Sequence, residues 1–146
     1  MKRWPWFLVA AGVLALDQGS KAVVDLYFAP GDGMPLIPRV LSLLRVHNTG
    51  AAFGLFPEGT VAFVVVASAV TALLGGYLLS GRAHGLCGWG AALVVAGALG
   101  NLLDRVQRGY VLDFLALPHF PVFNVADSAL VLGAFLLGLG LLRRTR

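Results

Sequence analysis

Residues 60–80 read TVAFVVVASAVTALLGGYLLS, a stretch without a single charged side chain. About 20 predominantly apolar residues are needed for a helix to cross the hydrocarbon core of a bilayer. The stretch has that length and therefore predicts a membrane-spanning helix. The chain as a whole agrees, because 58% of its 146 residues are hydrophobic and only 12% are charged, against about 25% charged residues in soluble domains. We expect a single integral membrane domain over residues 1–146.

Three further stretches predict spanning helices, at residues 4–24, 86–103 and 123–142. Residues 86–103 are rich in glycine and alanine, as close helix packing in a bilayer favours. A cleaved signal peptide is the alternative for residues 4–24, but no convincing small-residue cleavage site follows and the apolar character resumes at Ala22. The expected fold is therefore an all-α membrane protein with four transmembrane helices.

The segment at residues 25–59 differs from these spans. It contains Pro30, Pro35, Pro38 and Pro57, several glycines and the partly alternating run RVLSLLRV at residues 39–46. Such a pattern is typical of a small extramembrane sheet or hairpin. The segment continues with HNTGAAFG at residues 47–54, whose small residues let the backbone approach a helix or ligand closely. We expect Phe53, Leu55 and Phe56 to reach the membrane interface.

The basic residues predict an orientation. With four spans, both termini and the turn at residues 81–85 share one side of the membrane. That side holds basic residues and no acid: Lys2, Arg3, Arg82, Arg143, Arg144 and Arg146. The positive-inside rule then places both termini in the cytoplasm. The net charge of +4 does not indicate a nucleic-acid partner, because the basic residues lie at segment ends and form no patch.

Two carboxylates, Asp113 and Asp127, bracket a short aromatic loop broken by prolines, and this orientation puts both near the outer face. An ionisable group costs roughly 2.5–3.5 kcal/mol at the centre of a spanning helix, so its presence there needs a reason. Two neighbouring carboxyl groups share one proton, and such a pair can activate water and protonate a carbonyl oxygen or leaving nitrogen. The pair is thus a candidate for peptide hydrolysis.

Other polar residues lie on helix faces at the same end. Gly97, Asn101 and Arg105 repeat every four residues, and Asp17 and Lys21 are also four apart. Each has a structural alternative. Asp17 and Lys21 can form an ion pair inside the bundle. Arg105 can extend to the interface, and Asn101 can join helices.

Asn124 and Asp127 are three residues apart at the start of the last span, where Asn124 is also a candidate N-cap. That alternative leaves Asp113, Asn48 and Asn101 unexplained. Because all these groups lie at the outer end, we interpret them together as one site.

Other catalytic arrangements fit the sequence less well. There is no His-Glu-x-x-His metal motif and no Gly-x-Ser-x-Gly nucleophile elbow. His84 and Cys87 have helical spacing, but they lie at the cytoplasmic end and two ligands do not make a zinc site. Ser128 cannot face its neighbour Asp127 to form a triad with His119. We expect no metal and no cofactor.

Five short motifs, in order along nearly the whole chain, resemble those of the lipoprotein signal peptidase family, also called signal peptidase II. They are DQGSK at residues 17–21, NTGAAFG at 48–54, GALGNLLDR at 97–105, VLDF at 111–114 and FNVADS at 123–128. The loop at residues 114–122 is shorter than in many members, which leaves its contacts with substrate open.

The resemblance implies a bacterial inner-membrane aspartyl endopeptidase that cleaves prolipoprotein signal peptides before a diacylglyceryl-modified cysteine. By motif position, Asp113 and Asp127 form the catalytic dyad. The motif positions also imply substrate-binding and supporting residues: Asn48, Gly97, Asn101, Arg105 and Asn124 line the site, and Asp17 and Lys21 support it. The family further implies an extracytoplasmic β-like cradle from residues 25–59, contact with membrane lipid, and inhibition by globomycin-type cyclic peptides.

Two functions from other classes remain as alternatives. A small transporter or channel subunit would use Asp17 and Asp127 to bind protons or cations, and it would place its acids nearer the middle of the membrane. A non-catalytic membrane scaffold would tolerate the loss of either acid.

Overall fold

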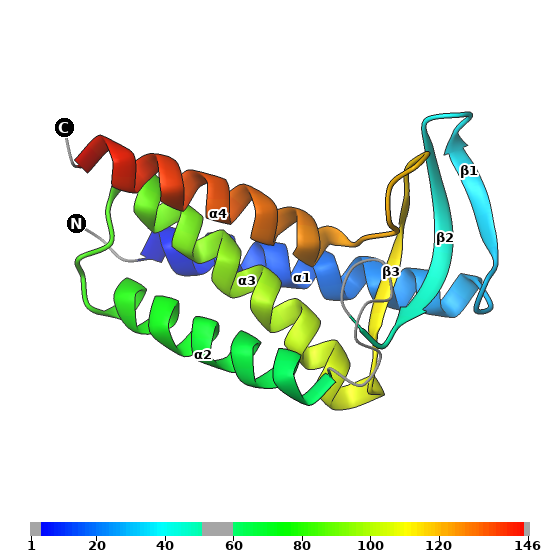
Figure 1. Ribbon diagram of the computed structural model, residues 1–146, viewed down its shortest axis with the longest axis horizontal. Coiled ribbons are helices and arrows are strands. Elements are labelled where there is room, and N and C mark those ends of the chain that lie inside the picture. Colours follow the sequence, from blue (N-terminus) through cyan, green and yellow to red (C-terminus); the bar gives the residue numbers. More distant parts are fainter. Residues whose placement is uncertain (1–3, 51–59, 145–146) are drawn as a thin grey trace.

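The computed structural model of the chain describes residues 4–50 and 60–144. In order, these form the elements α1 (Trp4–Tyr27), β1 (Gly33–Ile37), β2 (Leu41–Asn48), α2 (Thr60–Leu79), α3 (Gly85–Arg108), β3 (Val111–Ala116) and α4 (Val125–Arg144). Each of the four helices is long and apolar enough to cross a membrane. The expected architecture of four transmembrane helices with a small β cradle is confirmed. Figure 1 shows the start of α1 and the end of α4 at one end of the bundle and the sheet at the other.

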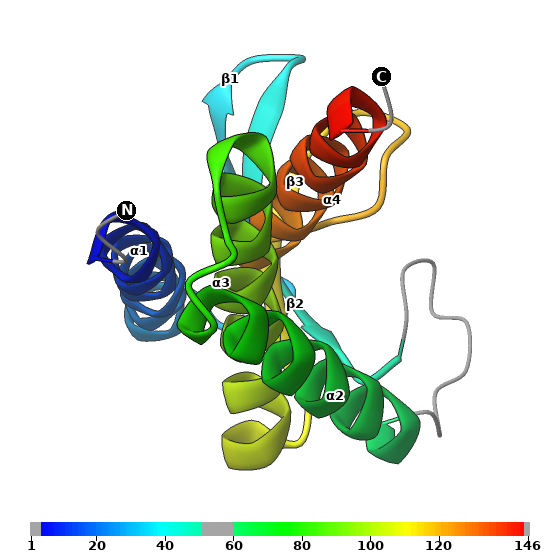
Figure 2. The same cartoon turned by 90° about the vertical axis from the view of Figure 1, so that its left-hand side faces the viewer.

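The bundle is organised around α3, which lies between α1 and the other two helices (Figure 2). Small residues make this central position possible, because they let backbones approach closely. Gly90 of α3 and Gly133 of α4 face each other so closely that a Cβ added to either would lie 2.6–2.8 Å from a backbone atom of the opposite helix. On another face, the ring of Trp6 fills the space above Gly88. The glycine and alanine content of residues 86–103 thus serves helix packing.

The extramembrane sheet has three antiparallel strands in the order β1, β2, β3. The first two come from the segment at residues 25–59, as expected. The third lies between α3 and α4, where the sequence predicted only a loop, so Asp113 lies on a strand and not in a loop. Gly109 ends α3 in the left-handed conformation, with φ of 78° and its N–H bonded to the Arg105 carbonyl oxygen. The apolar run VLDFLA then pairs with β2, with Val46 opposite Asp113.

Some expectations concern residues outside the described ranges. These are the interface contacts of Phe53, Leu55 and Phe56, and the ends of the chain with Lys2, Arg3 and Arg146.

Candidate active site

The two candidate catalytic carboxylates are brought together by Asn124, which lies immediately before α4. Its side-chain Nδ2 donates to Asp113 Oδ1 over 2.7 Å, and its backbone N–H donates to Asp127 Oδ2 over 3.1 Å. Its Oδ1 accepts from the backbone N–H of Asp127 over 2.9 Å. This reciprocal pattern is a capping box. Asn124 is therefore an N-cap, and the same residue also joins the two carboxylates.

Two more amides complete the hydrogen bonding of these carboxylates. Asn48, the last residue of β2, donates to Asp113 Oδ2 over 2.9 Å. Asn101 of α3 donates to Asp127 Oδ1 over 2.7 Å. Each of the four carboxylate oxygens thus accepts one N–H, from three amide side chains and one backbone group. The strand, the two helices and the cap hold both acids in fixed orientations.

Asp113 is only 2% exposed. Burial raises the pKa of its carboxyl group to about 7, because the charged form loses its hydration, and the charge of Asp127 acts in the same direction. The amide donors Asn48 and Asn124 and the charge of Lys21 oppose this rise in pKa. Asp113 therefore changes protonation state close to neutral pH.

Behind the two carboxylates lies a buried charge cluster formed by α1 and α3. The Lys21 ammonium contacts Asp17 Oδ2 at 2.8 Å and Asp104 Oδ2 at 2.9 Å, and all three side chains are fully buried. Asp17 Oδ1 also accepts the backbone N–H of Ala126 over 2.9 Å, which ties α1 to the start of α4. The ion pair given above as the structural alternative for Asp17 and Lys21 is present. It is attached to the site through a hydrogen bond of 3.2 Å from Lys21 to Asn101 Oδ1.

Two members of this cluster were not predicted from the sequence. Asp104 accepts Lys21 and the backbone N–H of Leu112, and the Gln18 amide donates to both Asp17 and Asp104. Asp104 follows Gly100 by four residues, the same spacing as Asp17 and Lys21. The spacing of four residues places Gly100 and Asp104 on one face of the helix. This spacing is the sequence signal that could have identified Asp104 as a buried acid.

Arg105 extends from α3 towards the same site. Its guanidinium donates to the backbone oxygens of Gly50 at 3.3 Å and Asn101 at 3.5 Å, and lies 5.0 Å from the centre of the Phe63 ring. Within the part of the chain that the structure describes, its buried Nε has no hydrogen-bond partner. Arg105 therefore brings a positive charge close to Asp113 and Asp127.

A cavity of about 890 Å³ opens beside both carboxylates. Five predicted site residues line it: Asn48, Asn101, Arg105, Asp113 and Asp127. The remaining wall is mainly apolar and follows the connection to α4 and one face of that helix, including Phe123, Leu130, Val131, Leu132 and Phe135. The site therefore joins a polar end to an apolar groove, which we call the α4 groove.

The other predicted residues lie outside the residues that line this groove. Asn124, Asp17 and Lys21 lie behind the carboxylates and act on them as described above. Gly97 lies between α3 and α4, where a Cβ would collide with the carbonyl oxygen of Ala126. Gly97 therefore lets α3 and α4 approach each other closely at Ala126, the residue before Asp127.

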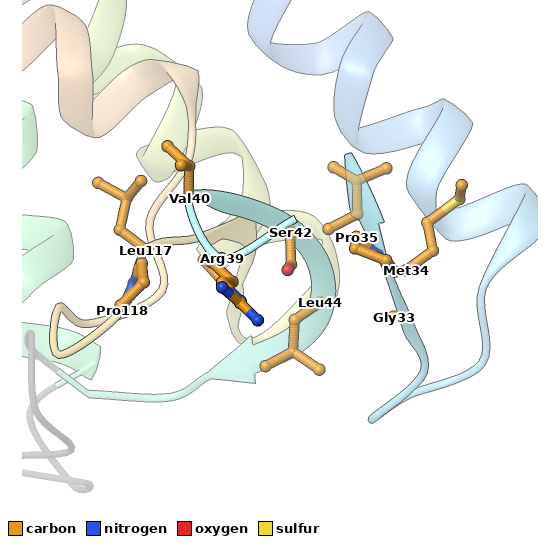
Figure 3. A pocket seen from close by; sticks show the side chains of 11 residues that line it. Gly33, Met34, Pro35, Arg39, Val40, Ser42, Leu44, Leu117 and Pro118 are labelled. Atoms are coloured by element: carbon orange, nitrogen blue, oxygen red, sulfur yellow. The ribbon is translucent and has the colours of Figure 1, made fainter. Parts of the chain in front are cut away.

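A second hollow, of about 530 Å³, lies on the sheet and contains none of the predicted site residues. Figure 3 shows Leu117 and Pro118, which follow β3, beside Val40 and Arg39 of the β1–β2 turn. Leu117 also lines the α4 groove. The two hollows therefore border each other at this residue.

Known structures share this fold. The chain superposes on a bacterial membrane enzyme solved by the in meso method at 2.3 Å resolution, with a TM-score of 0.90 and 31% sequence identity over 97% of this chain and 89% of the other. A second bacterial membrane enzyme, solved at 1.9 Å, gives a TM-score of 0.85 at 31% identity over 94% and 92% of the two chains. The fold is that of a multi-pass bacterial membrane enzyme.

Sequence comparisons define the family. The family model for signal peptidase (SPase) II matches residues 9–143. A lipoprotein signal peptidase of Pelotomaculum thermopropionicum is 43% identical over 93% of this chain and 90% of the relative, and one of Moorella thermoacetica is 44% identical over 91% and 89%. The chain belongs to the signal peptidase II family, as its five motifs indicated, and is a membrane protease.

Proposed function

We propose that the protein is an aspartyl endopeptidase that removes signal peptides from diacylglyceryl-modified prolipoproteins, cutting just before the lipid-modified cysteine. The observation that carries this proposal is the position of Asp113 and Asp127 at the polar end of the α4 groove, with an N–H donor on each carboxylate oxygen. The names of the relatives support the substrate class.

In the proposed reaction the two carboxyl groups hold one proton between them. The ionised group takes a proton from water while the water oxygen attacks the scissile carbonyl carbon, and the protonated group gives its proton to the carbonyl oxygen. The resulting diol then breaks its C–N bond. A diol hydroxyl returns its proton to the ionised carboxylate, the protonated carboxyl group protonates the leaving nitrogen, and the pair again holds one proton. The raised pKa of Asp113 supports proton sharing near neutral pH.

The α4 groove supports a lipid-modified substrate. Its wall is mainly apolar and includes Val131, Leu132 and Phe135, which are 73%, 52% and 65% exposed on a helix that crosses the bilayer. The acyl chains of a diacylglyceryl group can pass from the membrane into a groove with such an apolar wall without crossing water. Arg105 lines the polar end, where its positively charged guanidinium suits a backbone carbonyl oxygen of the substrate. We also propose that globomycin-type cyclic peptides bind in this groove and that membrane lipid borders it.

We further propose that both termini face the cytoplasm of a bacterium, that the spans cross its inner membrane, and that the site lies near the outer face. Charge supports this orientation. Arg82 is exposed in the connection between α2 and α3. Figure 1 shows this connection at the end of the bundle that holds the termini. At the sheet end, Arg45 and Arg108 are paired with Asp25, which reduces the net positive charge there.

The test is conversion of a purified, lipidated precursor by the purified protein in detergent. Asp113→Asn and Asp127→Asn should each lower the rate by at least about a thousandfold, because general acid–base catalysis contributes roughly 10²–10⁴-fold and each variant also loses the shared proton. Both variants should still insert in the membrane. We expect the parent to need no added metal and to keep its activity in a chelator.

A matched control is Asp32→Asn. Asp32 is an exposed carboxylate of the same extramembrane region, and its side chain accepts the backbone N–H of Ala29. This variant should process the precursor at the parental rate. Normal cleavage by Asp113→Asn or Asp127→Asn would refute the aspartyl mechanism and favour the scaffold alternative, whereas uptake of protons or cations without cleavage would favour the transporter.

A further inference from the structure

The buried Lys21 has an unusual set of partners. An ammonium group has three N–H donors and accepts no hydrogen bond. The Lys21 donors have three oxygen partners, at 2.8 Å on Asp17, 2.9 Å on Asp104 and 3.2 Å on Asn101. The third contact requires that the carbonyl oxygen of the Asn101 side chain, and not its NH₂ group, points towards Lys21.

The orientation of Asn101 determines the next two contacts. With its oxygen towards Lys21, its NH₂ group donates to Asp127 Oδ1 over 2.7 Å. The same oxygen also accepts from Asn124 Nδ2 over 3.1 Å, and that NH₂ group donates in addition to Asp113 Oδ1 over 2.7 Å. The Asn101 and Asn124 amides therefore connect the Lys21 ammonium, which can only donate, to the Asp127 and Asp113 carboxylates, which accept hydrogen bonds when ionised.

Reversal of the Asn101 amide would be costly. Its NH₂ group would face the Lys21 ammonium and the NH₂ of Asn124, and its oxygen would face the Asp127 carboxylate. Buried polar groups left without partners cost about 1–3 kcal/mol each, and more when they are charged. Lys21 thus selects one of two amide orientations, and the selected one favours ionised carboxylates.

The charges around Asp113 define what a titration would report. Lys21 and Asp17 approach from α1, Asp104 and Arg105 from α3, and Asp127 from α4. Two cations thus face four carboxylates, counting Asp113 itself. Loss of either cation makes ionisation of Asp113 harder, and loss of one of the other carboxylates makes it easier.

We propose that Lys21 is a positioning residue of the catalytic site, which orients the Asn101 and Asn124 amides so that both donate to the catalytic carboxylates and keeps one carboxylate ionised at neutral pH. Lys21 does not line the α4 groove and acts through these amides. This inference rests on the proposed aspartyl mechanism for its catalytic meaning.

The test compares pH–rate profiles of three variants with the parent. In Lys21→Met the ionised form loses a positive charge and an oriented donor, so the acid limb of the profile should move to higher pH by about one unit. In Asp104→Asn a negative charge is lost while Lys21 remains, so the limb should move to lower pH. Opposite displacements from two substitutions in one cluster are not the result of general structural damage.

The double variant Lys21→Met with Asp104→Asn separates charge from orientation. It removes one positive and one negative charge, so the net charge of the cluster is that of the parent. No N–H then points from residue 21 to Asn101, and the acid limb should stay displaced to higher pH. A return of the limb to the parental position would overturn the role in orientation.

A substrate-free measurement keeps the two proposals distinguishable. The pKa of Asp113 can be followed by NMR of ¹³C-labelled aspartate in micelles, with the signal assigned by its absence in Asp113→Asn. It should rise in Lys21→Met and fall in Asp104→Asn even if the parent cleaves no precursor, an outcome that would refute only the proposed function. If Lys21→Met does not fold, Asp104→Asn decides, and an unchanged pKa in that variant overturns the inference. Loss of activity at all pH values without displacement would also overturn it.

Discussion

Gly100 tests how closely α3 must approach the Asp17 carboxylate. A Cβ added at this position would lie 2.6 Å from Asp17 Oδ2 and 3.2 Å from both Asp17 Cγ and the Ala126 side chain. Ordinary contact begins at 3.4 Å. In Gly100→Ala the carboxylate must therefore move by about 0.8 Å, or α3 must move away from α1.

The displaced carboxylate holds contacts on both of its oxygens. Oδ2 contacts Lys21 at 2.8 Å, and Oδ1 accepts the backbone N–H of Ala126 at 2.9 Å. Overpacking costs about 1–3 kcal/mol, and full loss of one partner from a buried ion pair costs about 3–5 kcal/mol. Because the ion pair here is stretched and not removed, we expect Gly100→Ala to lower the free energy of unfolding by about 2–4 kcal/mol.

The assay is thermal unfolding in detergent, where this loss corresponds to a Tm lower by roughly 5–15 °C. Gly138→Ala is the matched control, since among the described residues nothing lies within 4 Å of a Cβ at Gly138, a helix-interior position in α4. There alanine should raise stability by up to about 1 kcal/mol through helix propensity. An unchanged Tm for Gly100→Ala, or an equal loss for both variants, would refute the reasoning.

Two further predictions concern pH and the groove. The pKa of Asp113 is about 7 in the folded state, above its ordinary value of 3.8, so the stability that its protonated form contributes is lost as pH rises through 7. The free energy of unfolding in detergent should therefore fall by about 2–3 kcal/mol between about pH 5 and pH 8. Asp113→Asn should lack this change. Val131→Trp places a large ring in the α4 groove, so it should raise the KM for precursors with long acyl chains by about tenfold, which corresponds to roughly two methylene groups that are no longer buried, and affect short-chain precursors less. Val66→Trp, at an exposed position on α2 outside the lining of the groove, should leave this KM unchanged, and equal effects of the two tryptophans would exclude the groove as the acyl site.

The sequence predicted the helical fold well because spanning a bilayer imposes length and composition on each helix. The uncharged α2 and the glycine-rich α3 are examples. The two-stranded part of the cradle was also predicted, since its prolines and alternating residues are local signals. These features depend on neighbours in the chain, and a pattern of residues records them directly.

The strand that carries Asp113 was not predicted, because its pairing is with a distant partner. β3 is short and almost wholly buried, and its strand partner is β2, far earlier in the chain, with Phe123 bonded to its other edge. A short apolar run gives no periodicity that separates a strand from a loop. Asp104 was missed for a related reason. At the end of a helix it resembles any interface acid, and only the approach of Lys21 from α1 shows that it belongs to the buried cluster.

The predicted gathering of polar residues at one end agrees with the structure, but their division of labour was not predictable. Asn124 is both an N-cap and a link between the carboxylates. Gly97 was expected to bind substrate, and it lies where α3 and α4 touch. An asparagine or a glycine at these positions in the sequence is compatible with helix capping, helix packing or substrate binding. The tertiary contacts decide which of these roles each residue has.

The buried cluster also has a consequence for the order in which the protein matures. Asp17 and Lys21 lie four residues apart in the first helix, so that helix carries its own counter-ion when it leaves the ribosome and enters the bilayer. Asp104 arrives with the third helix and Asp127 only with the last. The carboxylates therefore meet only after the fourth span has been inserted. Under the proposed aspartyl mechanism, the chain therefore gains protease activity only when its last span is in place.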